Sequence, residues 1–209
     1  METYVTKTDI YRAAEIVKAG GLVGVPTETV YGLACDGLNA PAVERIYEVK
    51  GRPETKPISL LVSGMDDAEK FCVNIPRGAY VLAKKFWPGP LTMILQKRGN
   101  VPEVVTAGGN TVGIRCPAHK LTLSLIKLSG VPLAAPSANL SGMPSPKDAQ
   151  AVLGYFNGKI ECVIDGGECS VGVESTIVDL TAAQPKILRQ GGLPAEEIER
   201  ALGEKAAQA

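Results

Sequence analysis

Short apolar runs alternate irregularly with helix-forming segments along this chain, and glycine or proline stands at most of the junctions. The sequence contains 23 glycines and 15 prolines among 209 residues. Because both residue types interrupt regular structure, the turns between elements are tightly specified. Strands that interleave with helices without a repeating order predict an α/β or α+β fold around one large mixed sheet. A chain of this length can bury such a core as a single domain, residues 1–209.

The spacing of apolar residues and the capping signals predict the individual elements. Apolar residues recur at i, i+3, i+4 and i+7 from Ile10, which predicts a helix over residues 9–18. Ser145-Pro146 has the pattern of an N-cap followed by proline at the first helical position, so we expect a helix to begin there. Residues 203–209 are expected to form a frayed tail. Further helices are expected over residues 41–50, 65–72, 77–86 and 121–128 and from Pro194, and strands over residues 22–25, 58–62, 91–96, 111–115, 131–135, 160–164, 175–180 and 185–189.

Composition narrows the class of protein. Lys and Arg number 22, as do Asp and Glu, so overall charge argues against a protein that coats nucleic acid or an acidic membrane, while a local basic pocket remains compatible. No basic-then-apolar leader and no apolar run of membrane-spanning length occur, which predicts a cytoplasmic protein without membrane partners. The cysteines form no CxxC pair and are expected to be free thiols of a reducing compartment: Cys35, Cys72, Cys116, Cys162 and Cys169.

A first polar stretch, Pro26 to Leu33, directly follows a predicted strand. It brings two hydroxyls, one carboxylate and one phenol together between Thr27 and Tyr31. Thr and Glu often act as capping residues in turns, so an ordinary turn is one interpretation. The polar wall of a pocket at the end of a strand is the other.

Three cations, Lys50, Arg52 and Lys56, lie close together at the end of a predicted helix. The favourable interaction of cations with a helix C-terminus accounts for Lys50. It does not account for Arg52 and Lys56, because Gly51 and two prolines place them in a rigid loop. A rigid loop with cations in front of an apolar strand favours a clamp for polyphosphate.

The stretch from Ala134 to Gly142 runs out of a buried strand into small hydroxyl and amide side chains. Backbone N–H groups at such a junction, together with serine hydroxyls, form a cradle for an anion. A Ser/Asn-rich turn without a ligand is the alternative. Together with residues 50–52, residues 136–139 therefore predict one anion site that the two stretches share.

Two arginines, Arg115 and Arg189, end predicted strands and need partners if they are buried. A bound carboxylate or phosphate is one such partner, and a neighbouring Asp or Glu is the other. With His119 as the single histidine, a His-based triad has little room, and His119 is expected at a helix start. Neither a GxxxxGK[ST] loop nor a GxGxxG turn after a strand is present, so any nucleotide must be bound by other groups.

Taken together, the polar stretches resemble the YrdC family of threonylcarbamoyl-AMP synthases in their order and spacing. The resemblance extends from about Thr8 to Leu202. The matching stretches are PTETVYGL at 26–33, KGRPETKP at 50–57, FWPGPLT at 86–92, VGIRCPAH at 112–119, APSANLSG at 135–142, PSP at 144–146, ESTIVD at 174–179 and ILRQGG at 187–192.

The resemblance implies a twisted, open mixed sheet flanked by helices around a concave, positively lined cavity, in the short, single-domain form of the family. It also implies a nucleotidyltransferase that converts L-threonine, bicarbonate and ATP into threonylcarbamoyl-AMP and pyrophosphate, with Mg²⁺ bridging the phosphates. The product would supply the t6A modification of tRNAs that read codons beginning with A, through a downstream transfer complex.

The resemblance also assigns roles to individual residues. The family's Lys-x-Arg and Ser-x-Asn signatures, the implied catalytic cluster, fall on Lys50, Arg52, Ser137 and Asn139. Threonine would be held by Thr29, Arg115 and Ser175, with backbone help near Ala135 and a side chain near Leu61, where some relatives have histidine. ATP would be held by Arg52, Lys56, Thr111, Ser137, Ser145 and Arg189, and the ligands of the metal ion stay unnamed.

Two other functions compete with this synthase. A concave basic surface also suits a module that binds double-stranded RNA or ribosomal precursors, and weak RNA binding is compatible with either function. Zero net charge and few aromatic residues argue against that module as the main role. A third hypothesis is the carbamoyl transfer of hydrogenase maturation, whose proteins carry CxxC motifs that this chain lacks.

Overall fold

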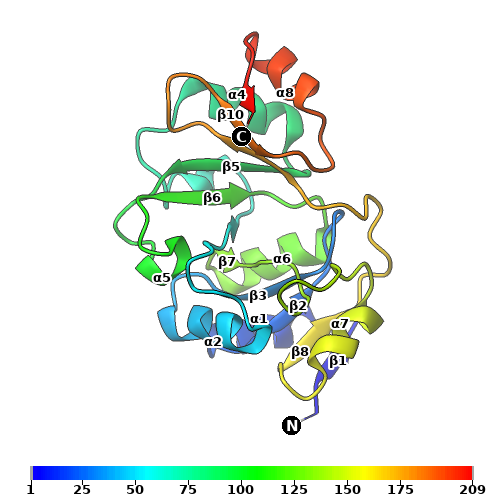
Figure 1. Ribbon diagram of the computed structural model, residues 1–209. Helices are drawn as coiled ribbons and strands as arrows, with labels where there is room; N and C mark the ends of the chain where they lie inside the picture. Colours follow the sequence, from blue (N-terminus) through cyan, green and yellow to red (C-terminus); the bar gives the residue numbers. More distant parts are fainter. Residues whose placement is uncertain (1, 209) are drawn as a thin grey trace.

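The computed structural model describes residues 2–208, in which eleven strands form one open sheet (Figure 1). Their order across the sheet is β1-β8-β2-β3-β7-β4-β6-β5-β9-β10-β11. The pairing of β4 with β6 is parallel and that of β5 with β6 is antiparallel, so the predicted mixed sheet is confirmed. The strands are β1 (Tyr4–Thr6), β2 (Val23–Val25), β3 (Gly32–Asp36), β4 (Leu60–Leu61), β5 (Leu91–Gln96), β6 (Thr111–Arg115), β7 (Leu133–Ala134), β8 (Cys162–Ile164), β9 (Thr176–Asp179), β10 (Lys186–Arg189) and β11 (Ala207–Gln208).

Helices cover both faces of the sheet. Figure 1 shows α4 and α8 at the end of the molecule that carries β5, β9 and β10, whereas α1, α2 and α7 lie at the other end. The helices in residues 2–208 are α1 (Ile10–Lys18), α2 (Ala40–Lys50), α3 (Met65–Ala68), α4 (Arg77–Phe86), α5 (Glu103–Thr106), α6 (Lys120–Ser129), α7 (Ala149–Phe156) and α8 (Ala195–Leu202). None of the helices in this described part is long and apolar enough to cross a membrane.

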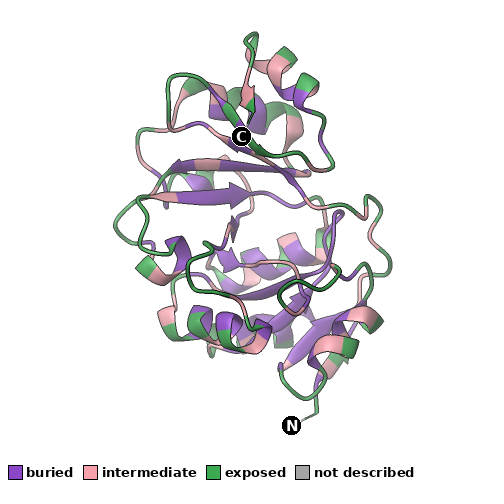
Figure 2. Cartoon of the chain, viewed as in Figure 1, coloured by how far each residue is buried: buried purple, intermediate pink, exposed green. Residues whose placement is uncertain are grey.

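Alternate residues of the central strands serve two separate cores, because successive side chains of a strand point to opposite faces. In β3, Leu33 and Cys35 join the larger core, and Ala34 joins the smaller one. The smaller core packs against α1 and α6, which contribute Val17 and Leu125. The larger core lies under α2 and α7 and continues to α4 and α8. The sheet is therefore buried on both faces, as Figure 2 shows for its central strands.

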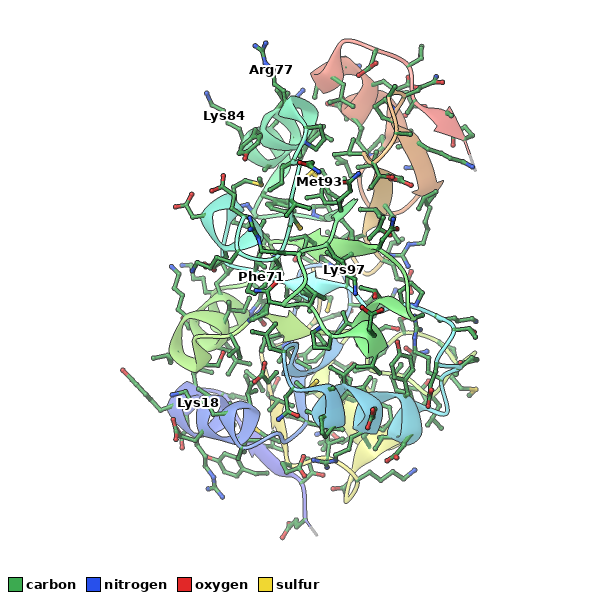
Figure 3. All side chains as sticks on the ribbon, turned by 90° about the vertical axis from the view of Figure 1, so that its left-hand side faces the viewer. Lys18, Phe71, Arg77, Lys84, Met93 and Lys97 are labelled. Carbon is green, nitrogen blue, oxygen red and sulfur yellow. The ribbon has the colours of Figure 1, made fainter. Side chains whose placement is uncertain are left out.

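The outer helices turn their charged side chains to solvent. Figure 3 shows Arg77 and Lys84 pointing away from α4, and both are exposed. Met93 of β5 lies inside the larger core and is fully buried. This separation of charged and apolar residues is what an amphipathic helix over a sheet requires.

Capping fixes the helix that leads into the cationic loop. The side chain of Asn39 accepts a hydrogen bond from the Ala42 N–H (3.2 Å) and begins α2. Gly51 ends this helix in the left-handed conformation, with φ of 57°. Glycine adopts that conformation without steric cost, so the chain turns sharply after Lys50.

Several elements differ from what the sequence predicts. The helix expected at Ser145-Pro146 begins at Ala149, because Asp148 accepts the Ala151 N–H (2.7 Å) and caps it instead. The tail expected to be frayed contains β11, whose Ala207 pairs in parallel with Lys186 of β10. Strands β1 and β3 were not predicted, since the hydrophobic pattern of both is interrupted by polar or small residues.

Several other elements exist but are shorter than the sequence predicts. The strands expected over residues 58–62 and 131–135 pair as strands only at Leu60–Leu61 and Leu133–Ala134. Of the flanking residues, Ile58, Ser59 and Ala135 line the site described below. His119 stands at the N-cap position of α6, as predicted.

Candidate functional site

A polar cavity of about 180 Å³ lies where β4, β6 and β7 end and where the loops before β3 and β9 pass them. Its wall comes from segments far apart in the sequence, since Thr29, Arg52, Arg115, Ser137 and Ser175 all line it. Seven segments of the chain reach this place, because neighbouring short strands end near one another at the middle of the sheet. Such an edge is where open α/β sheets bind ligands.

Arg115 ends β6 and lines the cavity although only 8% of its surface is exposed. Its Nη2 donates to Glu28 Oε1 (2.7 Å) and its Nε donates to the Gly89 carbonyl (3.3 Å). The protein partner that the sequence left open is therefore a neighbouring glutamate. A ligand carboxylate would be an additional partner.

Arg189 ends β10 and lies against Ser175. Its Nε and Nη2 donate to the Ser175 carbonyl (3.0 and 2.8 Å), and Nη2 also reaches Ser175 Oγ (3.2 Å). The Ser175 hydroxyl lies 2.8 Å from Thr92 Oγ1 of β5. Gly191 permits this arrangement, because a Cβ there would lie 2.2 Å from the Glu174 carbonyl oxygen. β5, β9 and β10 thus fix one wall of the cavity.

Arg52 occupies the loop after α2 and lines the cavity from the other side. Its Nε donates to the Lys56 carbonyl (3.3 Å) and its Nη2 to the Pro57 carbonyl (3.0 Å). Burial lowers the pKa of its guanidinium from the ordinary value, although Tyr47 opposes that change. The side chain of Lys56 is exposed and does not line the cavity.

The three arginines share one arrangement. In Arg52, Arg115 and Arg189, Nε and Nη2 are held by oxygen atoms of the protein. Within residues 2–208, no protein acceptor binds the Nη1 atom of any of the three. Each guanidinium is therefore oriented by the fold and keeps donors for a ligand.

Lys50 is buried, at 2% exposure, behind the loop that follows β7 and does not line the cavity. Its ammonium donates to the carbonyls of Ser137 and Asn139, both at 2.5 Å. Desolvation, and secondly the charge of Arg52, lower its pKa from 10.5 to about 7. Asn139 is also buried and accepts the Ser137 hydroxyl through Oδ1 (2.5 Å). These contacts hold the loop after β7 in its conformation. Of Lys50, Ser137 and Asn139, only Ser137 lines the cavity.

The loop before β3 supplies hydroxyl groups to the opposite wall. Thr27 Oγ1 donates to the Val30 carbonyl (2.6 Å), so the Thr29 hydroxyl is the donor in their 2.9 Å contact. Burial raises the pKa of Tyr31 to about 12, and its hydroxyl donates to the Gly167 carbonyl (2.8 Å). The polar side chains of this stretch are therefore held by hydrogen bonds to one another and to other parts of the protein.

Glu174 is a carboxylate at the wall of the cavity. The Ser145 hydroxyl donates to its Oε1 (2.6 Å), and this hydrogen bond, with smaller effects of Arg189 and Lys147, lowers the pKa of Glu174. Glu174 is thus ionised at neutral pH. It is the acidic lining side chain among the described residues, beside three arginines, so the cavity favours an anionic ligand.

The structure brings together many of the predicted residues but leaves some outside the cavity. Those that line it are Thr29, Arg52, Leu61, Arg115, Ala135, Ser137, Ser175 and Arg189. Those that do not are Lys50, Lys56, Thr111, Asn139 and Ser145. Lys50, Asn139 and Ser145 contact residues that do, whereas Thr111 lies at the far end of β6 from Arg115.

Sequence reasoning did not select Ser59, Thr92 and Glu174 as site residues, although all three line the cavity. Each of Ser59 and Thr92 is a polar residue inside a predicted apolar strand, and this interruption of the apolar pattern could have identified them as site residues. Glu174 is adjacent to Ser175, which was predicted as a site residue, so its position in the sequence could have identified it as well.

Comparison with known proteins identifies the family. Residues 15–191 match the family model of Sua5, YciO and YrdC proteins, which is described as "Telomere recombination". The chain belongs to this family. It is 53% identical to the threonylcarbamoyl-AMP synthase of Pyrococcus abyssi, over 92% of this chain and 56% of the relative. It is 45% identical to the threonylcarbamoyl-AMP synthase of Bacillus subtilis, over 93% of this chain and 56% of the relative.

A solved Sua5 structure has the same fold as this member of the family. The crystal structure of P. abyssi Sua5 complexed with L-threonine superposes with a TM-score of 0.95 at 48% identity. The match covers 99% of this chain and 62% of that one. This chain therefore spans somewhat more than half the length of these relatives.

Proposed function

We propose that this member of the Sua5/YciO/YrdC family is a threonylcarbamoyl-AMP synthase, a nucleotidyltransferase that makes threonylcarbamoyl-AMP and pyrophosphate from L-threonine, bicarbonate and ATP. The observation that carries the proposal is the polar cavity lined by three arginines, Arg52, Arg115 and Arg189, whose Nη1 atoms have no acceptor among residues 2–208. Two anionic substrates, an amino acid and a nucleoside triphosphate, need several such donors. The names of the relatives and the threonine complex of P. abyssi Sua5 support the same substrates.

In this proposal Arg115 binds the carboxylate of threonine. A planar guanidinium matches a carboxylate, and Arg115 is already oriented by Glu28 and Gly89. Ser175 and Thr29 complete the polar surroundings of the amino acid, while Leu61 and the backbone at Ala135 contact the rest of it. The apolar side chain of Leu61 suits the methyl group of threonine.

ATP occupies the part of the cavity between Arg52, Ser137 and Arg189 in this proposal. In the same proposal Lys56, Thr111 and Ser145, which do not line the cavity, contact the parts of the nucleotide that extend beyond it. Lys50 and Asn139 act from behind, because their contacts hold the loop that carries Ser137. Lys50 would then be a positioning residue rather than one that touches the phosphates.

Mg²⁺ would arrive with ATP as part of the substrate. Magnesium in nucleotide sites is held chiefly by phosphate oxygens and by one or two carboxylates. Within residues 2–208 no group of three or more His, Cys, Asp and Glu side chains is placed to hold a metal ion, and in this proposal the phosphates supply most of the ligands. Glu174, ionised and at the cavity wall, fits the role of a carboxylate beside a phosphate-bound ion.

The proposed reaction requires the protein to orient the substrates and to stabilise the negative charge that develops. Bicarbonate supplies carbon dioxide by losing hydroxide, and the neutral amine of threonine bonds to its carbon and releases a proton, so that a carbamate and water result. A carbamate oxygen then attacks the α-phosphorus of ATP, and the bond from that phosphorus to the leaving pyrophosphate breaks. Negative charge grows on the phosphoryl and leaving-group oxygens, and fixed cationic donors stabilise it. No covalent protein nucleophile takes part. The product would pass to the complex that completes t6A in tRNA, in the cytoplasm where these substrates occur together.

The test is a pyrophosphate-release assay with the purified chain. We expect release from ATP to require both L-threonine and bicarbonate, and the nucleotide product to have the mass of threonylcarbamoyl-AMP. Omitting threonine or bicarbonate in turn provides the control. Equal release of pyrophosphate without threonine would contradict the proposal.

A further inference from the structure

Glu28 contacts two hydrogen-bond donors at once from behind the cavity wall. Its Oε1 accepts Nη2 of Arg115 at 2.7 Å, and its Oε2 accepts the backbone N–H of Ala118 at 2.9 Å. Glu28 is 7% exposed and does not line the cavity, whereas Arg115 does. Its carboxylate is therefore directed away from any ligand and towards a residue that faces one.

Arg115 has little freedom left once these contacts are made. Glu28 holds Nη2, the Gly89 carbonyl holds Nε, and the salt bridge between Glu28 and Arg115 is buried on both sides. The guanidinium is planar, so fixing two of its nitrogen atoms also fixes the direction of the third. Nη1 then has a single orientation relative to the cavity.

We infer that Glu28 is a positioning residue for the amino-acid substrate, which aims Nη1 of Arg115 at the carboxylate of threonine. The inference rests on the proposed function, in which Arg115 binds that carboxylate. Without Glu28, a buried arginine would keep its charge but would lose one of the two contacts that set its angle. Affinity for threonine would fall, whereas binding of ATP, which Arg115 does not contact in the proposal, would not.

Only a carboxylate of this length suits position 28. Both partners, Arg115 Nη2 and the Ala118 N–H, are donors, and an ionised glutamate offers an acceptor to each. Glutamine has the same shape but a single acceptor oxygen, so its amide nitrogen would face a second donor. Aspartate keeps both acceptors but is one methylene shorter and cannot reach both donors from the same backbone position.

Glu161 provides a matched control elsewhere in the fold. It has the same pair of contacts, since Oε1 accepts Nη2 of Arg45 at 2.8 Å and Oε2 accepts the backbone N–H of Leu22 at 2.7 Å. Neither Glu161 nor Arg45 lines the cavity. Glu161→Gln therefore repeats the chemical change of Glu28→Gln without the connection to a ligand.

The first experiment compares Glu28→Gln, Glu161→Gln and the wild-type chain. Titration calorimetry measures the Kd for L-threonine and for ATP, and thermal unfolding monitors the fold. For Glu28→Gln we expect the threonine Kd to rise about tenfold, the order expected when a buried donor loses its acceptor, and the ATP Kd to stay within twofold. Glu161→Gln should change neither constant. An unchanged threonine Kd in a folded Glu28→Gln protein would overturn the inference.

A double-mutant cycle tests whether Glu28 acts through Arg115. Arg115→Lys should weaken threonine binding by itself, and adding Glu28→Gln should weaken it no further. If the two substitutions raise the threonine Kd independently, so that the double variant shows the product of the two single effects, the inference is overturned. If Glu28→Gln unfolds the chain, Glu28→Asp keeps the charge and should give a smaller rise in the threonine Kd; wild-type affinity in that variant would count against the inference.

A third measurement does not depend on threonine. In ¹⁵N spectra of the arginine side chains, the Arg115 guanidinium should rotate slowly in the wild type and faster in Glu28→Gln. A wild-type chain that shows slow rotation but binds no threonine would refute the proposed function and leave the restraint by Glu28 standing. Equal rotation in both proteins would refute the restraint itself.

Discussion

Lys50 carries a buried ammonium whose burial has a measurable consequence for stability. It is 2% exposed, and the contacts of its Nζ are the carbonyls of Ser137 and Asn139. Desolvation lowers its pKa from 10.5 to about 7. In the unfolded chain the same lysine titrates near the ordinary value of about 10.4. Between these two pH values the unfolded chain therefore binds more protons than the folded one.

This difference sets the sign of the pH dependence. The free energy of unfolding rises with pH wherever the unfolded state binds more protons, by up to about 1.4 kcal/mol per pH unit for one group. The destabilising effect of the buried charge is fully present below pH about 7 and disappears as pH rises past the unfolded value. From pH 7.5 to pH 9.5, Lys50 should raise the stability of the wild type by about 2 to 3 kcal/mol relative to a Lys50→Met variant, which lacks the titrating group.

Urea unfolding at both pH values measures this change, with the fluorescence of the single tryptophan, Trp87, as the signal. The stability difference between wild type and Lys50→Met should shift in favour of the wild type as pH rises. Lys84→Met, which removes an exposed lysine of α4 (Figure 3), is the control for general effects of losing a cation. A difference that stays constant within about 0.5 kcal/mol would refute the reasoning, since it would mean that the two carbonyls offset the desolvation of the charge.

The remaining predictions concern the site, a helix cap and the core. Arg52→Ala should lower threonine-dependent pyrophosphate release by about 10²-fold or more with little change in thermal unfolding, because it removes an oriented cation from the cavity; near wild-type turnover would count against its role. Asp148→Ala should destabilise the chain by about 1 kcal/mol in urea, since the side chain caps α7, and an unchanged midpoint would argue against the cap. Phe156→Ala should lower the free energy of unfolding by about 3–5 kcal/mol, because the ring is fully buried in the larger core. A decrease below about 1 kcal/mol would show that neighbouring core side chains move in to fill the space left by the ring.

Elements with a strong local signal could be predicted from the sequence. β5 and β6 have the bounds that the apolar pattern predicts, and α1 and α4 differ by a single residue or not at all. Their apolar residues keep one period throughout, so local pattern and tertiary burial favour the same structure. The polar stretches that border the cavity were also recognisable, because they interrupt apolar strands with hydroxyl, amide and cationic groups.

Other elements depend on partners that are distant in the sequence. β1 has three residues and exists because it pairs with β8, about 160 residues further along the chain. β11 likewise needs β10 as its partner. The start of α7 was misplaced because two capping signals compete within a few residues, and the one at Asp148 makes the cap. Ser145 instead donates to Glu174, a contact that only the tertiary fold supplies.

The sequence by itself determined which residue types were available for an anion site: the cationic loop at residues 50–56, the Ser/Asn stretch after β7, and arginines at the ends of two strands. The tertiary structure decided how they are used. It buried Lys50 behind the cavity and bound it to backbone carbonyls, and it paired Arg115 with Glu28, 87 residues apart in the chain. The reason is physical, since a charge pattern fixes what a side chain can bind, whereas burial and the neighbours across the sheet fix which partner it meets.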